Sequence, residues 1–174
     1  MTKAEFSRPL RIDTVGEADH RVEIAADPEE RAALSKRFDL IGIDRLEAQF
    51  VVRREAAGII ARGRVEAVLT QACAITGDPL PATIDEEVAI RFLEDGTPEP
   101  EEIELGESDM DTIFYAGAAI DLGEAAAETV ALALDPYPRG PNAEAALRAA
   151  GVLSEDEAGP FGALAGLKAK LEKP

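Results

Sequence analysis

Cysteine, histidine and tryptophan are almost absent from the 174-residue chain, which has one cysteine, one histidine and no tryptophan. A single cysteine excludes an internal disulfide and fits a reducing compartment. A structural zinc site takes four ligands that are mostly Cys and His, so we predict no metal site and no cofactor. A catalytic thiol needs a base, and the only histidine is His20, which we expect to be solvated or capping. The sequence therefore predicts no catalytic residue.

Basic residues are also scarce, with 18 Lys and Arg against 35 Asp and Glu, which gives a net charge of −17 and a pI near 4.4. Affinity for nucleic acid comes mainly from Lys and Arg that displace counterions. Such a surface predicts no broad direct binding of nucleic acid. It attracts basic proteins and raises their rate of association, so we expect a basic protein as partner.

Long apolar runs are missing as well. No stretch approaches the roughly 20 apolar residues that span a bilayer, and the opening "MTKAEFSRPLRID" has no apolar core of signal-peptide length. These observations predict a cytoplasmic protein that does not bind membranes. They do not indicate an oligomeric state.

Apolar residues make up 46% of the chain but aromatic residues only 5%, so Leu, Ile, Val and Ala must fill the core. Apolar and polar residues alternate with a period of two in 45–53, from 59 to 69 and in 84–92, with short turns between. This pattern predicts an antiparallel meander at about 45–93. The apolar residues in 6–12 and 22–24 predict two further strands before the meander.

Two helices are predicted near 28–38 and 121–135. Asp27 can cap the first, with Pro28 at its first position. Asp121 and Glu124 have the spacing of a capping box at the start of the second. A further strand is expected in "TIFYAGAAI", just before it. The fold class is therefore α+β, with a mostly antiparallel sheet against which the helices pack.

The chain is predicted to hold one α+β domain over 1–140 and an Ala/Gly-rich C-terminal tail over 141–174. The tail has one or two short helices, one at 143–150 and one marked by the apolar residues from Phe161 to Leu171.

An acidic segment stands out in 94–111, which has nine acidic residues and no basic one. It is expected to be a solvated loop or a docking segment for a basic partner, in which Glu101, Glu102 and Glu104 are candidate contacts. Asp109 and Asp111 are spaced as in an EF-hand loop, but the third acidic position and the sharp-turn glycine are missing, so calcium binding is not favoured.

The only cysteine lies in "CAIT", where Thr76 occupies the second place of a metal-binding C-x-x-C pair. Cys73 shares its parity with Ala67 and Leu69, so it is expected on the core side of a strand end as a small apolar residue. A role facing a partner or ligand stays open for Cys73 and Thr76, and a catalytic thiol is disfavoured because no cation or helix N-terminus is evident.

The stretch "DPYPRG" at 135–140 holds Tyr137 between two prolines and presents Arg139 beyond them. The prolines favour an extended backbone. The stretch is either a rigid helix stop or a docking segment, and Tyr and Arg are enriched in interface hot spots. Tyr137 and Arg139 are therefore candidate partner-binding residues.

Two motifs together resemble a known family. They are "QACAITGDPLPATIDEEVAIRF" and "IDLGEAAAETVALALDPYPR", separated by the acidic loop, and the opening "EFSRPLRID" fits as well. Over residues 5–140 the chain resembles the YceD family of large ribosomal RNA subunit accumulation proteins, and is closest to an alphaproteobacterial branch with C-x-x-T in place of C-x-x-C.

This resemblance implies a small cytoplasmic bacterial protein that is needed for normal levels of large-subunit ribosomal RNA. The resemblance implies no catalytic residues for this chain. Many members carry a Cys pair, of which only Cys73 is present here, so packing or docking is favoured over metal binding.

We therefore predict a non-enzymatic ribosome-biogenesis factor that supports the accumulation or processing of large-subunit ribosomal RNA. Its expected partner is a basic protein, either a large-subunit ribosomal protein or an assembly factor. One alternative is an acidic chaperone or regulator of a basic protein unrelated to the ribosome. Another is a metal-dependent nuclease that uses Asp85 and Glu87, although both are better explained as solvated strand residues.

Overall fold

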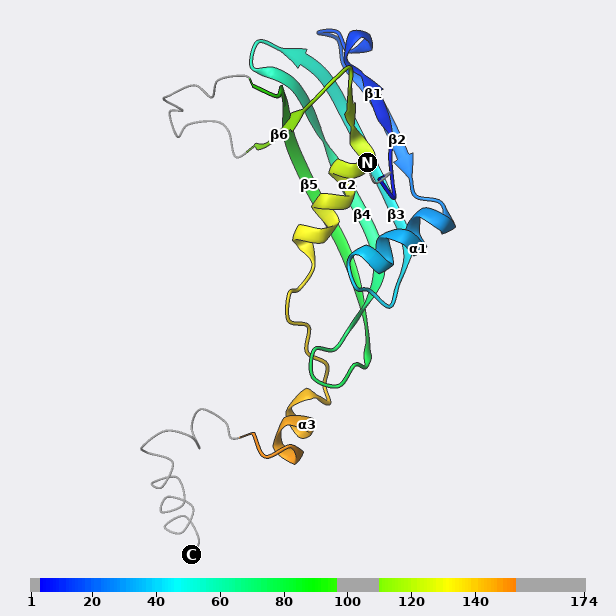
Figure 1. The fold of residues 1–174 in the computed structure, drawn as a ribbon, viewed down its shortest axis with the longest axis vertical. Coiled ribbons are helices and arrows are strands. Elements are labelled where there is room, and N and C mark those ends of the chain that lie inside the picture. The colour runs from blue at the N-terminus through cyan, green and yellow to red at the C-terminus, as the bar shows by residue number, and fades with distance from the viewer. Residues whose placement is uncertain (1–3, 97–109, 153–174) are drawn as a thin grey trace, which may run out of the picture. The chain divides into compact units, whose positions relative to one another are not determined.

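The computed structural model describes residues 4–96 and 110–152 (Figure 1). Two compact units make up the chain. The sheet unit comprises Met1–Gln71 and Pro81–Pro136, and the loop–strap unit comprises Ala72–Leu80 and Tyr137–Pro174. Each unit therefore combines segments that are distant in the sequence.

A five-stranded sheet in the order β2-β3-β4-β5-β6 forms most of the sheet unit. Its strands are β2 His20–Ala25, β3 Gly42–Glu55, β4 Gly58–Ala72, β5 Pro79–Glu94 and β6 Asp111–Tyr115. The first pairs are antiparallel, which confirms the predicted α+β class with a mostly antiparallel sheet. β6 instead runs parallel to β5, an orientation that needs a long crossover connection and was not predicted.

The pairing of β3 with β4 explains a glycine inside a strand. Phe50 stands opposite Gly63, and a β-carbon on Gly63 would come within 1.9 Å of the carbonyl oxygen of Gln49. Only glycine fits this close approach of two backbones. On the inner face of β3, Leu46, Phe50 and Val52 are all buried, as the period-two alternation predicts.

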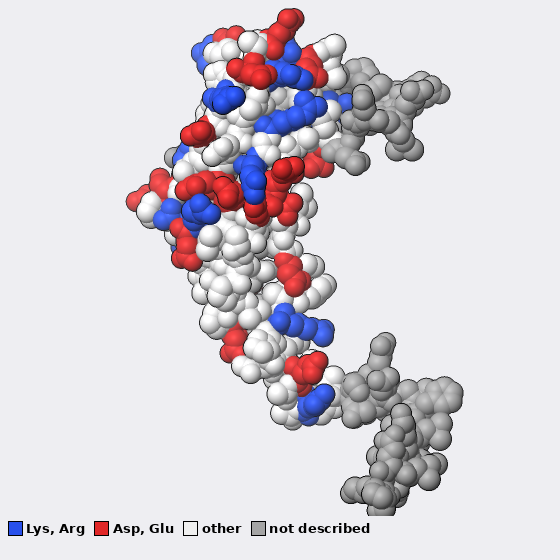
Figure 2. Space-filling model, turned by 180° about the vertical axis from the view of Figure 1, so that it is seen from behind, with Lys and Arg blue, Asp and Glu red and all other residues white. Residues whose placement is uncertain are grey.

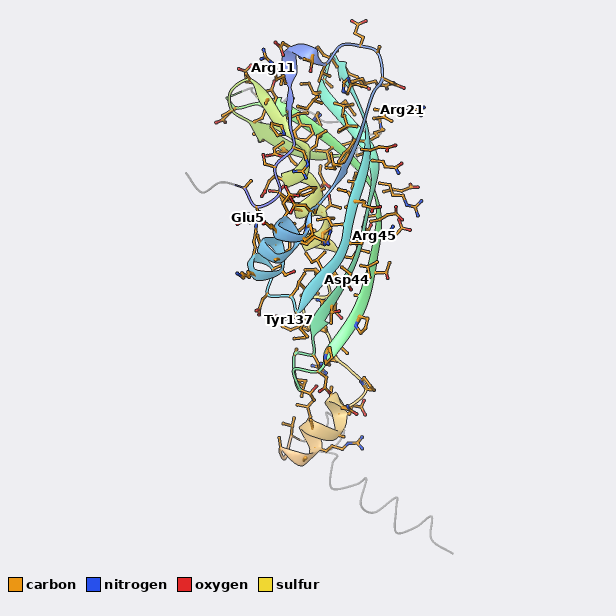
Figure 3. The ribbon with its side chains drawn as sticks, turned by 90° about the vertical axis from the view of Figure 1, so that its right-hand side faces the viewer. Glu5, Arg11, Arg21, Asp44, Arg45 and Tyr137 are labelled. Atoms are coloured by element: carbon orange, nitrogen blue, oxygen red, sulfur yellow. The ribbon has the colours of Figure 1, made fainter. Side chains whose placement is uncertain are left out.

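Two helices, α1 Pro28–Arg37 and α2 Leu122–Ala133, cover one face of this sheet (Figures 1 and 3). The predicted cap of α1 is confirmed, because Asp27 accepts from the backbone N–H groups of Glu29 and Glu30 and the Glu30 side chain accepts from that of Asp27. Both predicted helices are thus present, with ends within two residues of those expected.

The N-terminus of α2 differs from the predicted capping box. Asp121 caps the helix by accepting from the N–H groups of Gly123 and Glu124. The Glu124 carboxylate binds Arg37 of α1 at 2.6 Å. The acid expected to close the box therefore links the two helices.

The single strand predicted in "TIFYAGAAI" is wrong. The chain forms β6 and then a separate strand, β7 Ala119–Asp121, and between them Gly117 has φ +90°. A left-handed glycine interrupts the extended backbone and lets the chain turn. β7 pairs with β1 Pro9–Arg11 in a two-stranded sheet, so the first predicted strand lies outside the main sheet.

The core of the sheet unit forms from apolar side chains of the main sheet, the small sheet and both helices. Its largest fully buried members are Phe6, Phe50, Phe92, Leu34, Leu46, Ile59, Leu69, Ile120, Leu122, Val52 and Val65. Three are aromatic and the rest aliphatic, as the composition indicates. In the part of the chain that the structure describes, no helix is long and apolar enough to cross a membrane.

In the loop–strap unit, the helix predicted at 143–150 is present as α3 Ala143–Ala149. The second helix predicted for the tail, around Phe161–Leu171, lies outside the described residues.

Candidate functional site

The candidate site is built on the turn that joins β4 to β5, here called the cysteine loop, residues 73–78. The N–H of Cys73 donates to the carbonyl of Asp78 at 2.8 Å, and the N–H of Gly77 donates back to the carbonyl of Cys73 at 2.8 Å. Gly77 has φ +73°, a conformation that glycine adopts without steric cost. The loop is therefore closed by its own backbone.

A second segment, residues 137–142, packs against this loop and is here called the strap. The N–H of Ala74 donates to the carbonyl of Pro138 at 2.8 Å, and the N–H of Gly140 donates to the Cys73 sulfur at 3.4 Å. The Asn142 amide adds a bond to the Asp78 carboxylate at 3.3 Å. The two motifs singled out in the sequence thus form one hydrogen-bonded surface.

Cys73 lies at the centre of this arrangement and is 3% exposed, which confirms the predicted burial. The N–H of Gly140 lowers the pKa of the thiol to about 7, helped by the hydroxyl and backbone N–H of Thr76. These donors stabilise the thiolate. The expectation of a simply packed apolar residue is therefore incomplete, because the sulfur acts as a hydrogen-bond acceptor.

Thr76, in the place of the second cysteine of a C-x-x-C pair, has a structural role. Its hydroxyl bonds to the Cys73 sulfur and accepts from the N–H of Asp78 at 3.3 Å. The threonine at the second position of the motif therefore supports this turn through hydrogen bonds.

The described residues of the loop–strap unit include no histidine or lysine that would act as a base beside the thiol. Within residues 4–96 and 110–152, no three His, Cys, Asp or Glu side chains are grouped to hold a metal ion. What the arrangement does present is a set of exposed side chains. Tyr137 is 75% exposed, Ile75 is 37% exposed, and Arg139 is exposed beside them on the strap.

The structure brings four of the predicted site residues, Cys73, Thr76, Tyr137 and Arg139, into this unit. Glu101, Glu102, Glu104 and Asp109 lie outside the described residues. Of the two acids considered for a nuclease, Asp85 pairs with Arg64, and Glu87 is exposed.

Sequence reasoning missed Gly140, whose backbone N–H bonds the sulfur, and the Asn142–Asp78 contact. The Gly-Pro-Asn turn sequence at 140–142 marks a special backbone conformation there, but nothing in it shows which residue the glycine meets.

The fold and the site define an α+β chain with a hairpin loop tied to a proline-flanked strap. A family model described as "Large ribosomal RNA subunit accumulation protein YceD" matches residues 61–168, which include both the loop and the strap. The chain belongs to this family. The match leaves out the N-terminal "EFSRPLRID" that also supported the resemblance. Neither a curated protein nor a solved structure matches the chain.

Proposed function

We propose that the chain is a non-enzymatic, cytoplasmic factor that supports the accumulation or processing of large-subunit ribosomal RNA by binding a basic protein. The family description carries the link to ribosomal RNA. The expected partner is a large-subunit ribosomal protein or an assembly factor, which the chain keeps available for the growing subunit.

The observation that supports a basic partner is that most arginines are already paired with carboxylates of the same chain. Their charges are largely neutralised by the chain's own carboxylates, while acidic residues outnumber basic ones by 35 to 18. Among the described residues, the pairs are Arg8 with Glu30, Arg11 with Asp13, Arg37 with Glu5 and Glu124, Arg45 with Glu47, Arg53 with Glu55 and Asp19, Arg62 with Glu55, Arg64 with Asp85, and Arg148 with Glu144.

On the face of the sheet away from the helices, acidic and basic side chains are interspersed (Figure 2). Arg21 and Arg45 project from this side, whereas Glu5 lies near α1 (Figure 3). Cations that already have carboxylate neighbours release few counterions from a phosphate backbone. The surplus carboxylates favour a cationic polypeptide.

The contact residues that we assign to the partner are Tyr137, Arg139 and Ile75 of the loop–strap unit. Because hydrogen bonds fix the backbone of the strap, that backbone has little conformational freedom to lose when the exposed Tyr137 and Arg139 bind. Cys73 and Thr76 hold the loop beneath them and contribute to binding through its shape.

The proposal is tested with cells that lack the chain and produce it again from a plasmid. We expect wild-type protein to restore the ratio of large- to small-subunit ribosomal RNA, and Tyr137→Ala/Arg139→Ala to restore it poorly. The matched control, Phe114→Ala/Arg21→Ala, removes an exposed aromatic residue and an arginine from the sheet unit and is expected to behave as wild type.

The partner is identified by titrating purified large-subunit ribosomal proteins against the tagged chain at low and high salt. Binding of at least one of them, weakened by salt and by the strap variant, is the expected result. Capture of purified ribosomal RNA with no affinity for any basic protein would contradict the proposal.

A further inference from the structure

A groove in the sheet unit lies where α2 passes the strands β5 and β6. It has a volume of about 290 Å³ and is lined by Glu86, Glu87, Asp111, Thr129 and Leu132, among others. Leu132 is 83% exposed, the most exposed large apolar side chain among the described residues. An exposed leucine bordered by carboxylates combines an apolar contact with negative charge in one place.

Among the described residues, ion pairing distinguishes the carboxylates of the groove from Asp85, but not from other exposed acids of the sheet such as Glu23 and Asp44. None of Glu86, Glu87 and Asp111 forms a salt bridge with a described Lys or Arg, and all three are exposed. Their neighbour Asp85, one residue before Glu86, is held by Arg64. Arg64 also attracts Glu87, whose charge helps to raise the pKa of the arginine. The groove therefore keeps the charges of Glu86 and Asp111, with which no described Lys or Arg forms a salt bridge.

Helix α2 itself contributes no Lys or Arg to this region. Glu128, one turn before Leu132 on α2, has a raised pKa because partial burial and the neighbouring Glu124 disfavour its ionised form, although Arg37 opposes this. A cation brought to this side of α2 would relieve the repulsion between carboxylates.

We infer that this groove binds a lysine- or arginine-containing segment of a basic protein, with the aliphatic stem of a cationic side chain on Leu132 and its charged end between Glu86 and Asp111. Lysine and arginine bind in this manner because their stems are apolar and only their ends are charged. The inference rests on the proposed function and names the surface in the sheet unit through which the basic partner is held.

The test uses the full-length chain and a short labelled peptide that alternates lysine with valine, with fluorescence anisotropy at about 0.1 M salt as the measurement. Neutralising the groove with Glu86→Gln/Asp111→Asn is expected to weaken binding about tenfold, which is about 1.4 kcal/mol. Leu132→Ser, which leaves the charge unchanged, is expected to weaken it about threefold because the lysine stems lose their apolar contact.

The matched control is Glu23→Gln/Asp44→Asn, which raises the net charge by the same amount at exposed acids outside the groove. We expect it to change the affinity by less than about twofold, because these acids do not line the groove and salt screens the attraction between exposed charges that are not in contact. In amide spectra of the wild type, the peptide is expected to shift the signals of Thr129 and Leu132.

Equal losses from the groove and control variants would show general attraction to negative charge and would overturn the groove, leaving the proposed function intact. Failure of the wild type to bind the peptide at this salt concentration would also overturn it. A chain that binds the peptide in the groove but does not support ribosomal RNA accumulation in cells would overturn the proposed function alone.

Discussion

The sheet unit and the loop–strap unit are each stabilised internally by a different kind of interaction. The sheet unit buries a large apolar cluster from three layers of structure, whereas the described part of the loop–strap unit has only Cys73 and Ala143 buried. That part of the loop–strap unit has hydrogen bonds instead of an apolar cluster. The N–H of Ala74 donates to the Pro138 carbonyl, and the N–H of Gly140 donates to the Cys73 sulfur.

The difference indicates which unit is the more stable. A fully buried large apolar side chain contributes about 1.5–3 kcal/mol, but an intramolecular hydrogen bond contributes only about 1 kcal/mol net. The loop–strap unit is therefore expected to open locally at a lower free energy than the sheet unit.

The largest expected effect is the loss of core packing in the sheet unit. Phe50 is 2% exposed and stands against Gly63, so Phe50→Ala is expected to lower the free energy of unfolding by about 3–5 kcal/mol. Urea denaturation followed by circular dichroism measures this. The control Phe114→Ala removes a ring that is 45% exposed and should cost less than about 0.5 kcal/mol. Equal costs would contradict the assigned core.

An intermediate effect is expected at Asp121, where hydrogen bonds support the sheet unit. Its carboxylate caps α2 and also accepts from the Ser7 hydroxyl at 2.6 Å and the Arg8 N–H at 2.8 Å. Asp121→Ala is therefore expected to cost about 2 kcal/mol in the same denaturation experiment.

The comparison variant for Asp121 is Asp27→Ala. Asp27 caps α1 through the N–H groups of its own first turn, so its loss is expected to cost about 1 kcal/mol. A larger loss from Asp27→Ala would show that the bonds to Ser7 and Arg8 contribute nothing.

Near pH 7 the smallest effect is expected in the loop–strap unit, and this effect depends on pH. Because the folded state lowers the thiol pKa of Cys73 from its ordinary 9.0 to about 7, the unfolded state binds more protons between these values. The stabilisation is then fully present above about pH 9 and is lost as the pH falls through about 7. Amide hydrogen exchange at Ala74 and Gly140 should show protection that rises with pH in wild type relative to Cys73→Ser, after correction for intrinsic exchange rates.

Thr76→Val sharpens this test because it removes one donor to the sulfur and keeps the side chain's shape. The thiol pKa, measured by the ultraviolet absorbance of the thiolate, is expected to rise above its wild-type value. A pKa unchanged by Thr76→Val would show that the threonine hydroxyl does not bond to the sulfur.

The local patterns of the sequence were sufficient to predict most of the sheet unit. Alternation in 45–53 indicates which side chains of β3 are buried, and Asp27-Pro28 indicates where α1 begins, because both depend on residues close in the chain. The break at Gly117 was missed, since an isolated glycine in a strand pattern signals a bend only when its dihedral angles are known. The parallel pairing of β6 was missed because strand direction depends on a distant partner.

The candidate site shows the same limit. Cys73, Thr76, Tyr137 and Arg139 were selected from their types and neighbours, but their meeting in one unit was not predictable, since about sixty residues separate the loop from the strap. The acids of the groove were not predicted as a site, because they also come from segments that are distant in the sequence. Glu86 and Asp111 read as ordinary solvated residues until β5, β6 and α2 place them around Leu132.

The sequence by itself determined the α+β class, the anionic character, the ends of the helices and the family, because composition, periodicity and capping are encoded within short stretches of chain. Only the tertiary structure decided that Gly140 donates to the Cys73 sulfur, that Arg37 joins the two helices, and that unpaired carboxylates surround an exposed leucine. Those contacts join residues that are far apart in the chain, and hydrogen bonds and ion pairs form only between groups that folding has already brought within a few ångströms.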